Sequence, residues 1–543
     1  MNLNLKFGRR SFLSSLGAVS AGLFGSKKLS ALAPTAGNLG SMSSPGLPMV
    51  DGHSISPIVK GIGSTGNPWA ELGVAPMVNI TGTVTVMGGS VMKPEVIEAI
   101  RMGNMHFCVI DDLLVKSGKW LANLVKAPEG YTCLVTEGCA AGILVSYAGM
   151  LTEDYNERML NIPDLRGFPK TEVIIQQSHR DNFDHQIRQT GVKLVVVNTK
   201  DELLAAINER TVGIHFNHIQ SGRGPVTAEE VIAIAKAHNI YTFCDASADV
   251  PPKERLWELP AMGFDIVAFS GGKDICGPQA SGFLIGKENL LHWALLNMSP
   301  QENRIGRVCK VGKETLFGLL KAVELFVNQD YDATLKKYDE RADTITKALA
   351  KFGVTMERTY NGEALGNVSP HYQWTFDPEK IKLTSQDITQ KLGETKPVAI
   401  GPPPGLGMGA GGMSGRSDPN WTGPNDAAGG GGGGGGAGGG RRAGGAGAAG
   451  AAGGAAGGGR AGGAANAAVA GAPGAAGAPG GPGGGGGGGG RGGRSPNSFG
   501  FSTWMLKDGE DKYIANRLVE IFSAAAVPGS LTTPGKKPAA KKS

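Results

Sequence analysis

Short apolar runs alternate with amphipathic segments along the middle of the chain, from about residue 93 to residue 327. Apolar positions three and four residues apart predict helices over 93–102, 113–125, from 140 onward and over 228–237, the last capped by Thr227. Runs of consecutive apolar residues predict seven strands, at 132–135, 173–175, 194–197, 212–216, 241–243, 266–269 and 283–285. Nearly continuous apolar strands separated by helices are typical of a sheet covered on both faces. The sequence therefore predicts an α/β fold with a mainly parallel sheet.

A second, smaller unit is predicted after this region. Helical periodicity runs from Lys313 through the 340s, and a short apolar run at 398–400 precedes a long Gly- and Ala-rich stretch. A strand over 498–506 and a helix over 509–522 are predicted beyond it. Because extra length in a surface loop costs little free energy, we interpret the Gly-rich stretch as an insertion in a discontinuous small domain.

Composition divides the chain further. Many of its 88 glycines lie in the insertion, which has too little apolar surface to offset the entropy of ordering it. The predicted segments are a leader (1–36), an N-terminal arm (37–92), a large domain (93–327), a small domain (328–404 and 495–527), a disordered insertion (405–494) and a Lys-rich tail (528–543).

Charge is distributed unevenly over these segments. The leader holds five basic residues, the insertion six against two acids, and the tail four, so the body of the chain is acidic although the whole chain has a formal net charge of +6. An acidic body argues against a nucleic-acid surface, and no nucleic-acid partner is expected.

The leader resembles a twin-arginine export signal. Arg9 and Arg10 precede a weakly apolar run that extends to Phe24 and is too short to span a bilayer stably. A periplasmic or otherwise exported protein is expected, without a stable membrane span once the leader is removed. The alternative is a basic amphipathic N-terminus on a cytosolic protein.

The cysteines lie singly within apolar or loop segments, at positions 108, 133, 139, 244, 276 and 309. Their spacing does not recur as metal-ligand pairs do, so no metal site is expected. Buried free thiols are predicted, although an exported protein leaves a disulfide open.

The most informative stretch surrounds Lys273. A predicted strand ends at Phe269, three small residues follow, and Lys273 comes next. An amine at a strand end, with small neighbours and partial desolvation, is suited to hold a carbonyl cofactor. Upstream, Asp245 ends another buried strand, where its carboxylate would pair with the protonated pyridine nitrogen of pyridoxal phosphate (PLP). The alternatives are a surface lysine in a Gly turn and an Asp that caps a helix.

The segments CDASADVPP and FSGGKDICGPQASG, which contain these two residues, resemble the fold-type I PLP enzymes. Within them they resemble the group of bacterial selenocysteine synthase and D-glucosaminate-6-phosphate ammonia-lyase. The resemblance extends from about Met77 to Phe326, with NITGTVTVMGGSVM (79–92) and RIGRVCKVGKE (304–314) among its most specific parts. It implies an aspartate-aminotransferase-like large domain, a small α+β C-terminal domain, and PLP held by Lys273 as a Schiff base.

The resemblance also implies roles for a strand-turn-helix segment. In VTEGCAAG the backbone amides of Gly138, Cys139 and Ala140 would face the cofactor phosphate at a helix N-terminus. Ser270 would reach the same phosphate.

Further residues would surround the cofactor ring. His179 would stack on the pyridine, with His185 as second choice and a surface loop histidine as the alternative interpretation. Asn217 would lie near the 3′-oxygen. Ser247 stands where the family commonly has Ala beneath the ring, a departure that bears on reaction specificity.

Three basic residues, Arg304, Arg307 and Lys310, are candidates for binding the substrate carboxylate or another anion. Solvated charges at a helix start are the alternative.

The predicted function is a PLP-dependent lyase of the β-elimination or ammonia-lyase type, acting on an amino acid or amino-sugar acid. Lys273 would hold the cofactor and then act as the base that removes the α-proton. The alternatives are a tRNA-dependent selenium transferase, transamination, racemisation, aldol cleavage, and a non-enzymatic exported scaffold whose insertion binds partners. By analogy with the family, a homodimer or higher homo-oligomer is expected.

Overall fold

The structure is a computed structural model that describes residues 49–50, 53–54, 66–360, 367–394, 398–401 and 497–529. The chain divides into two compact units, Met1–Val74 and Ala75–Ser543. In the first, β1 (Met49–Val50) pairs antiparallel with β2 (His53–Ser54), and the short helix α1 spans Pro68–Glu71. The predicted leader, the insertion and the tail from residue 530 onward lie outside the described residues. The predicted domain boundaries stay predictions.

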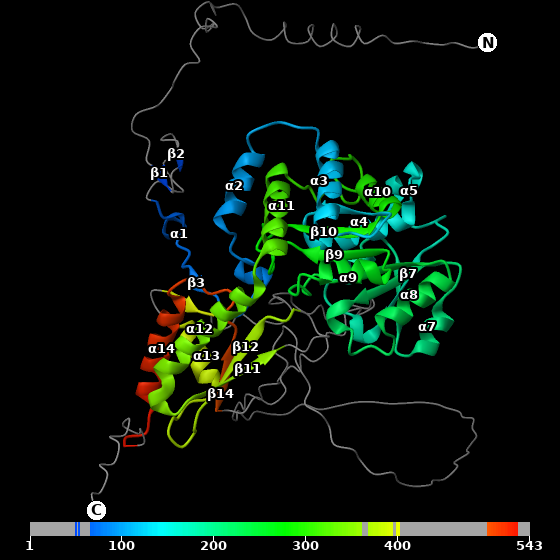
Figure 1. Cartoon of the computed structure of the whole chain (residues 1–543). Helices are drawn as coiled ribbons and strands as arrows, with labels where there is room; N and C mark the ends of the chain where they lie inside the picture. The colour runs from blue at the N-terminus through cyan, green and yellow to red at the C-terminus, as the bar shows by residue number, and fades with distance from the viewer. Residues whose placement is uncertain are drawn as a thin grey trace, which may run out of the picture. The chain divides into compact units, whose positions relative to one another are not determined.

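The second unit is built around a seven-stranded sheet with the order β4-β10-β9-β8-β7-β5-β6 (Figure 1). Six strands run in one direction, and β10 is antiparallel to both neighbours, β4 and β9. The strands are β4 (Tyr131–Thr136), β5 (Glu172–Gln176), β6 (Lys193–Val197), β7 (Thr211–Asn217), β8 (Tyr241–Asp245), β9 (Ile266–Ser270) and β10 (Gly282–Lys287). All seven predicted strands are present, and the predicted α/β fold is confirmed.

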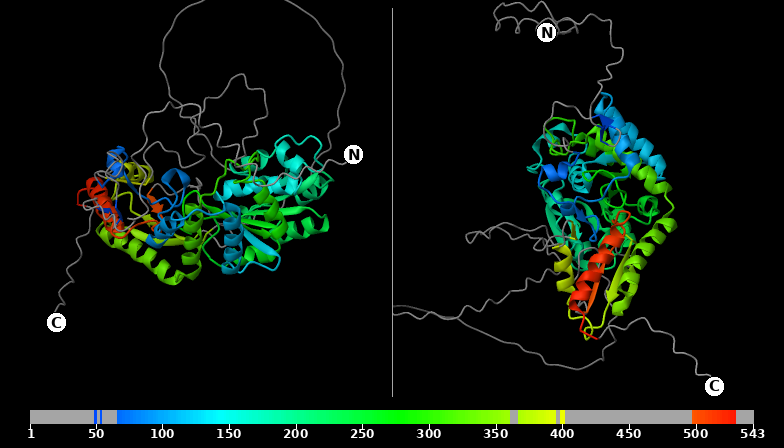
Figure 2. Two further views of the ribbon diagram at one scale, coloured as in Figure 1. Left: turned by 90° about the horizontal axis from the view of Figure 1, so that it is seen from above. Right: turned by 90° about the vertical axis from the view of Figure 1, so that its left-hand side faces the viewer.

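Helices cover the sheet, and every residue of the interior strand β7 is buried (Figure 2). They are α2 (Pro94–Gly103), α3 (Ile110–Leu124), α4 (Gly138–Thr152), α5 (Asn156–Asn161), α6 (His185–Arg188), α7 (Lys200–Ala206), α8 (Ala228–Ala237), α9 (Arg255–Met262), α10 (Glu288–Leu296) and α11 (Lys313–Asn328). Thr227 caps α8 as predicted, in a reciprocal capping box with Glu230. We call this part, residues 93–328, the large lobe.

A second hydrophobic core forms what we call the small lobe, residues 331–360, 367–394, 398–401 and 497–526. Its antiparallel sheet has the order β11 (Thr355–Tyr360), β12 (Pro370–Thr375) and β14 (Ser498–Phe501), and its helices are α12 (Tyr331–Leu349), α13 (Ser385–Gly393) and α14 (Glu510–Ala525). A parallel pair, β3 (Met77–Val78) and β13 (Ala399–Ile400), adds an early segment of the chain to this core. The insertion thus leaves after β13 and the chain returns at β14.

Two predicted elements differ from the structure. The helical stretch from Lys313 is two helices, because Gln329 is extended (ψ 147°) and the Asp330 side chain accepts a hydrogen bond from the Ala333 N–H that starts α12. The predicted strand 498–506 ends at Phe501. Beyond it, the Ser502 N–H bonds the Ile80 carbonyl outside the sheet.

All six cysteines are free. Cys133 and Cys244 are buried as expected, whereas Cys108 is exposed and the other three are half-buried. Among the described residues, no group of three or more His, Cys, Asp or Glu is placed to hold a metal ion. No helix in the described part is long and apolar enough to cross a membrane.

Candidate active site

Polar residues end three neighbouring parallel strands at one edge of the sheet. Asn217 ends β7 directly opposite Asp245, which ends β8 opposite Ala268 of β9. Ser270 ends β9, and Lys273 follows in the next loop. Ligands of open α/β sheets bind outside this carboxyl edge.

Lys273 and Asp245 are connected through Ser247. The Lys273 Nζ donates to the Ser247 Oγ at 3.4 Å, and the Ser247 N–H donates to the Asp245 Oδ1 at 2.9 Å. Asp245 is buried, and Lys273 is half-buried. The two residues that carry the predicted cofactor chemistry therefore lie in one site, and the predicted Ser247 lies between them.

The loop of Lys273 is packed so tightly that no side chain larger than that of glycine fits at position 272. A Cβ atom on Gly272 would lie 2.5 Å from the carbonyl oxygen of Gln279. Residues from an earlier part of the chain also contact this loop. The Ser90 hydroxyl donates to the Gly272 carbonyl at 3.1 Å, and the Gln279 side chain donates to the Thr85 carbonyl at 2.9 Å. The two sequence motifs 79–92 and FSGGKDICGPQASG (269–282) are thus in direct contact around the lysine.

The N-terminus of α4 faces the same site. A Cβ atom on Gly282, at the start of β10, would lie 2.9 Å from the Cys139 backbone nitrogen, so only glycine permits this approach. Burial raises the pKa of the Cys139 thiol, the negative charge of Asp245 raises it further, and the charge of Lys273 lowers it. The amides of residues 138–140 therefore start a helix beside the lysine and the aspartate, as an anion site requires.

His179 ends a short 3-10 turn (Gln177–His179) after β5 and is buried. Its Nδ1 accepts from the Asn217 N–H at 3.2 Å, and its ring meets Phe216 edge-on at 4.5 Å between centroids. Burial, with help from the nearby His215, lowers its pKa to about 4, so the ring is neutral at neutral pH. The Nε2 atom is buried without a partner among the described residues. His185, the second choice, is exposed on α6 beside Arg188.

Asp181 is a site residue that sequence reasoning missed. Its Oδ2 accepts from the Asn217 side-chain amide at 2.8 Å. Burial and the charge of Asp245 raise its pKa to about 6. The charges beside His179 suggested a surface loop, but Arg180 pairs at 2.7 Å with Asp184, which is buried. Neighbouring charges in sequence were a signal of an internal network rather than of solvent exposure.

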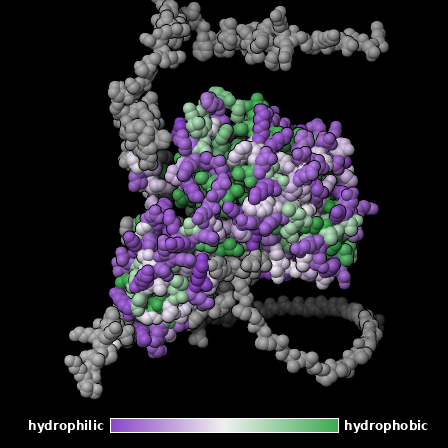
Figure 3. Space-filling model, viewed as in Figure 1, coloured by the Kyte–Doolittle hydropathy of each residue, from purple (hydrophilic) through white to green (hydrophobic). Residues whose placement is uncertain are grey.

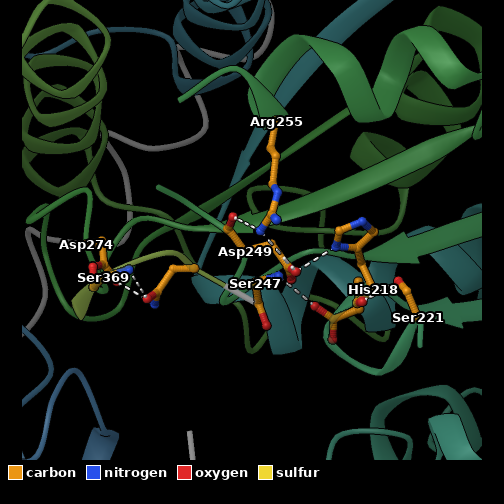
Figure 4. Close-up of polar contacts among 9 residues, drawn as sticks. His218, Ser221, Ser247, Asp249, Arg255, Asp274 and Ser369 are labelled. Carbon is orange, nitrogen blue, oxygen red and sulfur yellow. Dashed lines mark hydrogen bonds and ion pairs between the residues drawn. The ribbon is translucent and has the colours of Figure 1, made fainter. Parts of the chain in front are cut away.

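Two further polar groups support the loops around Lys273 (Figure 4). Asp249 accepts from the His218 ring at 2.6 Å, and its backbone carbonyl accepts from Arg255 at 2.7 Å. Asp274 accepts from Ser369 of the small lobe at 3.4 Å, and burial raises its pKa to about 8. His218 and Ser369 are distant in sequence from the aspartates that they contact, so no local pattern indicated these pairs.

Of the three predicted anion-binding residues, Arg304 lies away from the start of α4. Arg304 donates to the Asn156 side chain at 2.8 Å, beyond the C-terminal end of α4. Because α4 has 15 residues, this point is about 22 Å from the helix N-terminus. Arg307 and Lys310 are exposed.

The segment that carries them returns toward the site. The charge of Glu137, just before α4, adds to the effect of burial in raising the pKa of Cys309. Lys310 therefore follows a residue near the cofactor end of α4, whereas Arg304 lies at the opposite end.

The assembled groups fit PLP. The start of α4 supplies amides for a phosphate, Asp245 a buried carboxylate for a ring nitrogen, and His179 a neutral flat ring. Lys273 supplies the amine. Ser270 is half-buried at the end of β9, on the strand beside Asp245.

Comparison with known proteins is consistent with this arrangement. Residues 168–301 match the family model "Aminotransferase class-V". D-glucosaminate-6-phosphate ammonia lyase of Salmonella typhimurium is 26% identical over 339 residues, which cover 60% of this chain and 87% of the relative. The 5'-C-glycyluridine monooxygenase-decarboxylase of a Streptomyces species is 27% identical over 61% of this chain and 82% of the relative.

A more distant sequence relative is the L-seryl-tRNA(Sec) selenium transferase of Desulfovibrio desulfuricans, 25% identical over 44% of this chain and 54% of the relative. Among solved structures, D-glucosaminate-6-phosphate ammonia-lyase matches with a TM-score of 0.59 and 20% identity, over 85% of this chain and 99% of the other. The chain therefore has an aminotransferase-like fold, residues 168–301 are similar to the aminotransferase class-V family, and its sequence is similar to enzymes of the ammonia lyase and selenium transferase group.

Proposed function

We propose that this chain is a PLP-dependent lyase of the β-elimination or ammonia-lyase type, which acts on an amino acid or amino-sugar acid. The observation that carries the proposal is the link from Lys273 through Ser247 to Asp245 at the sheet edge, beside the start of α4. The similarity to D-glucosaminate-6-phosphate ammonia lyase supports the choice of reaction.

PLP, when bound, supplies an electron sink for carbanion chemistry. The chain's own groups would do the rest. The Lys273 Nζ would accept the α-proton of the substrate, and the Ser247 hydroxyl within 3.4 Å would orient that amine. The Asp245 carboxylate would hold a proton on the ring nitrogen. The hydrogen bond from the Asn217 N–H to the His179 Nδ1 would fix the orientation of the imidazole, which would lie against the pyridine ring of the cofactor.

The experiment is an absorption spectrum of the purified protein, followed by a screen of amino acids and amino-sugar acids for release of ammonia and a keto acid. Wild-type protein should show the visible band of lysine-bound PLP, and Lys273→Ala should lose it. Lys287→Ala is the matched control, because Lys287 lies at the opposite end of β10 and pairs with Asp265. A wild-type protein that retains no PLP would refute the proposal.

A tRNA-dependent selenium transferase is the second candidate, favoured by the similarity at 25% identity. The acidic body of the chain opposes it, since tRNA binding relies on basic surfaces. Tight, salt-sensitive retention of tRNA in a filter-binding assay would favour this candidate over the lyase.

A homodimer is proposed from exposed apolar side chains on and between α2 and α3. Figure 3 shows apolar surface along these helices. Phe107, Val109 and Met105 are 103%, 70% and 55% exposed, which is costly for large apolar groups in water. Light scattering should give twice the chain mass for wild type. Phe107→Ser should shift this toward the monomer, whereas Leu204→Ser, at an exposed position of α7, should not.

Export through the twin-arginine route is also proposed, on the basis of Arg9 and Arg10. Replacing both by Lys in a chain produced in bacteria should retain the protein in the cytoplasm. Equal periplasmic amounts of both forms would contradict the proposal.

A further inference from the structure

A cavity of about 400 Å³ lies between the large and small lobes, beside the residues that follow Lys273. The large lobe contributes Lys93, Pro251 and the residues that follow the lysine, Asp274 to Cys276. The small lobe contributes Arg341, Ser369 and the turn after β14. Lys273 itself does not line the cavity. The volume of the cavity is in the range of sites that bind small organic molecules.

Positive charge dominates the cavity wall. Lys93, Lys337, Arg341 and Lys507 line it, and Asp274 is the one acidic residue of the described lining. Burial raises the pKa of Asp274 to about 8, so this carboxyl is mostly protonated at neutral pH and offsets little of the charge. Low-dielectric walls of one sign concentrate the field and attract ions of the opposite sign.

The basic groups are largely uncommitted. Arg341 pairs at 3.3 Å with Asp508, whose side chain is 91% exposed and so contributes little. In the described part of the chain, the ammonium groups of Lys93, Lys337 and Lys507 form no ion pair. The indole N–H of Trp504, another lining residue, is buried without a hydrogen-bond partner among the described residues. Buried donors normally have a partner, so this N–H is available to an acceptor group of a ligand.

The same wall offers apolar and aromatic surface. Tyr338 and Trp504 come from the small lobe, and Ile275 and Phe326 from the large lobe. Donors combined with such surface suit a ligand that has a charged end and a carbon skeleton.

We propose that this cavity binds a small organic anion, a phosphorylated or carboxylated molecule of about the size of a sugar, and that the bound anion bridges the two lobes. Lys93 from one lobe and Lys337 and Arg341 from the other hold it. Because the wall includes Asp274 to Cys276, the ligand contacts the segment that positions Lys273. This site is distinct from the cofactor phosphate site at the start of α4.

The test is calorimetric titration of PLP-saturated protein with inorganic phosphate and with glucose 6-phosphate, so that the cofactor site is already filled. Both probes should bind, more weakly as salt increases. Lys93→Gln and Lys337→Gln should each weaken binding about tenfold or more, the cost of one hydrogen bond to a charged group. Lys321→Gln is the control, because Lys321 pairs with Glu324 on α11 outside the cavity.

Arg341→Gln also removes hydrogen bonds to Thr503 and Asp508, so its melting temperature is compared with that of wild type before its affinity is interpreted. Binding should also change the intrinsic tryptophan fluorescence of the protein, and Trp504→Phe should abolish that change. Binding that is absent, or that survives both lysine replacements unchanged, would overturn the proposal. This readout needs no turnover, so its failure is separate from failure of the proposed lyase.

Competition then identifies the source of the anion. If the cavity takes the distal group of the substrate, phosphate competes with D-glucosaminate 6-phosphate and not with D-glucosaminate. If the anion is a separate effector, phosphate competes with neither of them and changes the turnover number. Either pattern supports the site.

Discussion

At the residue scale, burial sets the protonation states in the candidate active site. It lowers the pKa of His179 to about 4, and it raises the pKa of Asp181 to about 6. Asn217 connects the two, since its N–H donates to the His179 ring and its side chain donates to Asp181. A neutral ring and a carboxyl that changes charge near physiological pH therefore share one hydrogen-bonded network.

Asp245→Asn should weaken PLP retention. The substitution keeps the size of the side chain but removes the charge that would pair with the ring nitrogen. Losing a hydrogen bond to a charged group costs on the order of 1.5–3 kcal/mol, or about ten- to hundredfold in affinity. Fluorescence titration with PLP measures the change. Asp265→Asn is the control, because Asp265 is buried at the opposite edge of the same sheet and bonds Thr242. Equal loss in both variants would argue against a specific role.

Asp181→Asn should change how stability depends on pH. The folded-state pKa of Asp181, about 6, exceeds the ordinary aspartate value of 3.8, so protonated Asp181 is favoured in the folded state. Its stabilising contribution is complete below pH 3.8 and is lost as pH rises through about 6. The variant should lack this loss, which is at most about 3 kcal/mol.

Denaturant unfolding of both forms from pH 4 to pH 7 checks this prediction. Because the pKa of His179 is lowered, its contribution to the free energy of unfolding increases with pH, opposite to that of Asp181. The difference in this free energy between variant and wild type is therefore the informative quantity. Parallel curves for the two forms would contradict it.

At the element scale, helix packing places the site. The helix α4 packs between the sheet and α10. Twelve of its 15 residues, on all sides of the helix, are therefore buried. A helix held in this way presents its N-terminus at a fixed position beside Asp245 and Lys273. On the outer side, α3 packs against β4, the strand that leads into α4.

Gly118→Ala tests the contact between α3 and β4. A Cβ atom on Gly118 would lie 2.1 Å from the carbonyl oxygen of Cys133, which is backbone and cannot move aside cheaply. We expect a loss of about 1–3 kcal/mol in the free energy of unfolding, typical of overpacking. Lys119→Ala, exposed on the same helix, should have little effect. Thermal unfolding distinguishes them, and equal melting temperatures would show that α3 tolerates a shift.

At the scale of the whole molecule, three distant segments enclose the loop of Lys273. Ser90, in the segment before the large lobe, bonds Gly272. Ser369 of the small lobe bonds Asp274, and the Asn367 N–H donates to the Ala248 carbonyl at 3.0 Å. The lysine therefore lies where the lobes meet, and changes in their arrangement reach it directly.

Deleting residues 405–494 should leave PLP binding and turnover within about twofold of wild type. The residues that pair β12 with β14 lie outside this segment, and the cost of loop closure depends only weakly on length. A short Gly-Ser linker replaces the segment in the experiment. Retained turnover with loss of binding to surfaces or polymers would instead favour an interaction role for the segment. A protein that no longer folds would show that it supports the small lobe.

Local patterns in the sequence determined much of this protein. Consecutive apolar residues identified all seven strands, and helical spacing with Thr227 identified α8, because such periodicities follow from the geometry of each element. Strand-end positions also identified Lys273 and Asp245 as partners, since the carboxyl ends of parallel strands meet at one edge.

Tertiary structure decided the contacts between segments that are distant in the sequence. It brought Asn217 to Asp181, Ser369 to Asp274, and motif 79–92 to the lysine loop. It also placed Arg304 at the far end of α4. Burial, and with it the pKa values of His179 and Asp181, arises only when the chain encloses these groups. A one-dimensional pattern records which residues face a core, whereas the distances and charges within a site are set by how the elements pack.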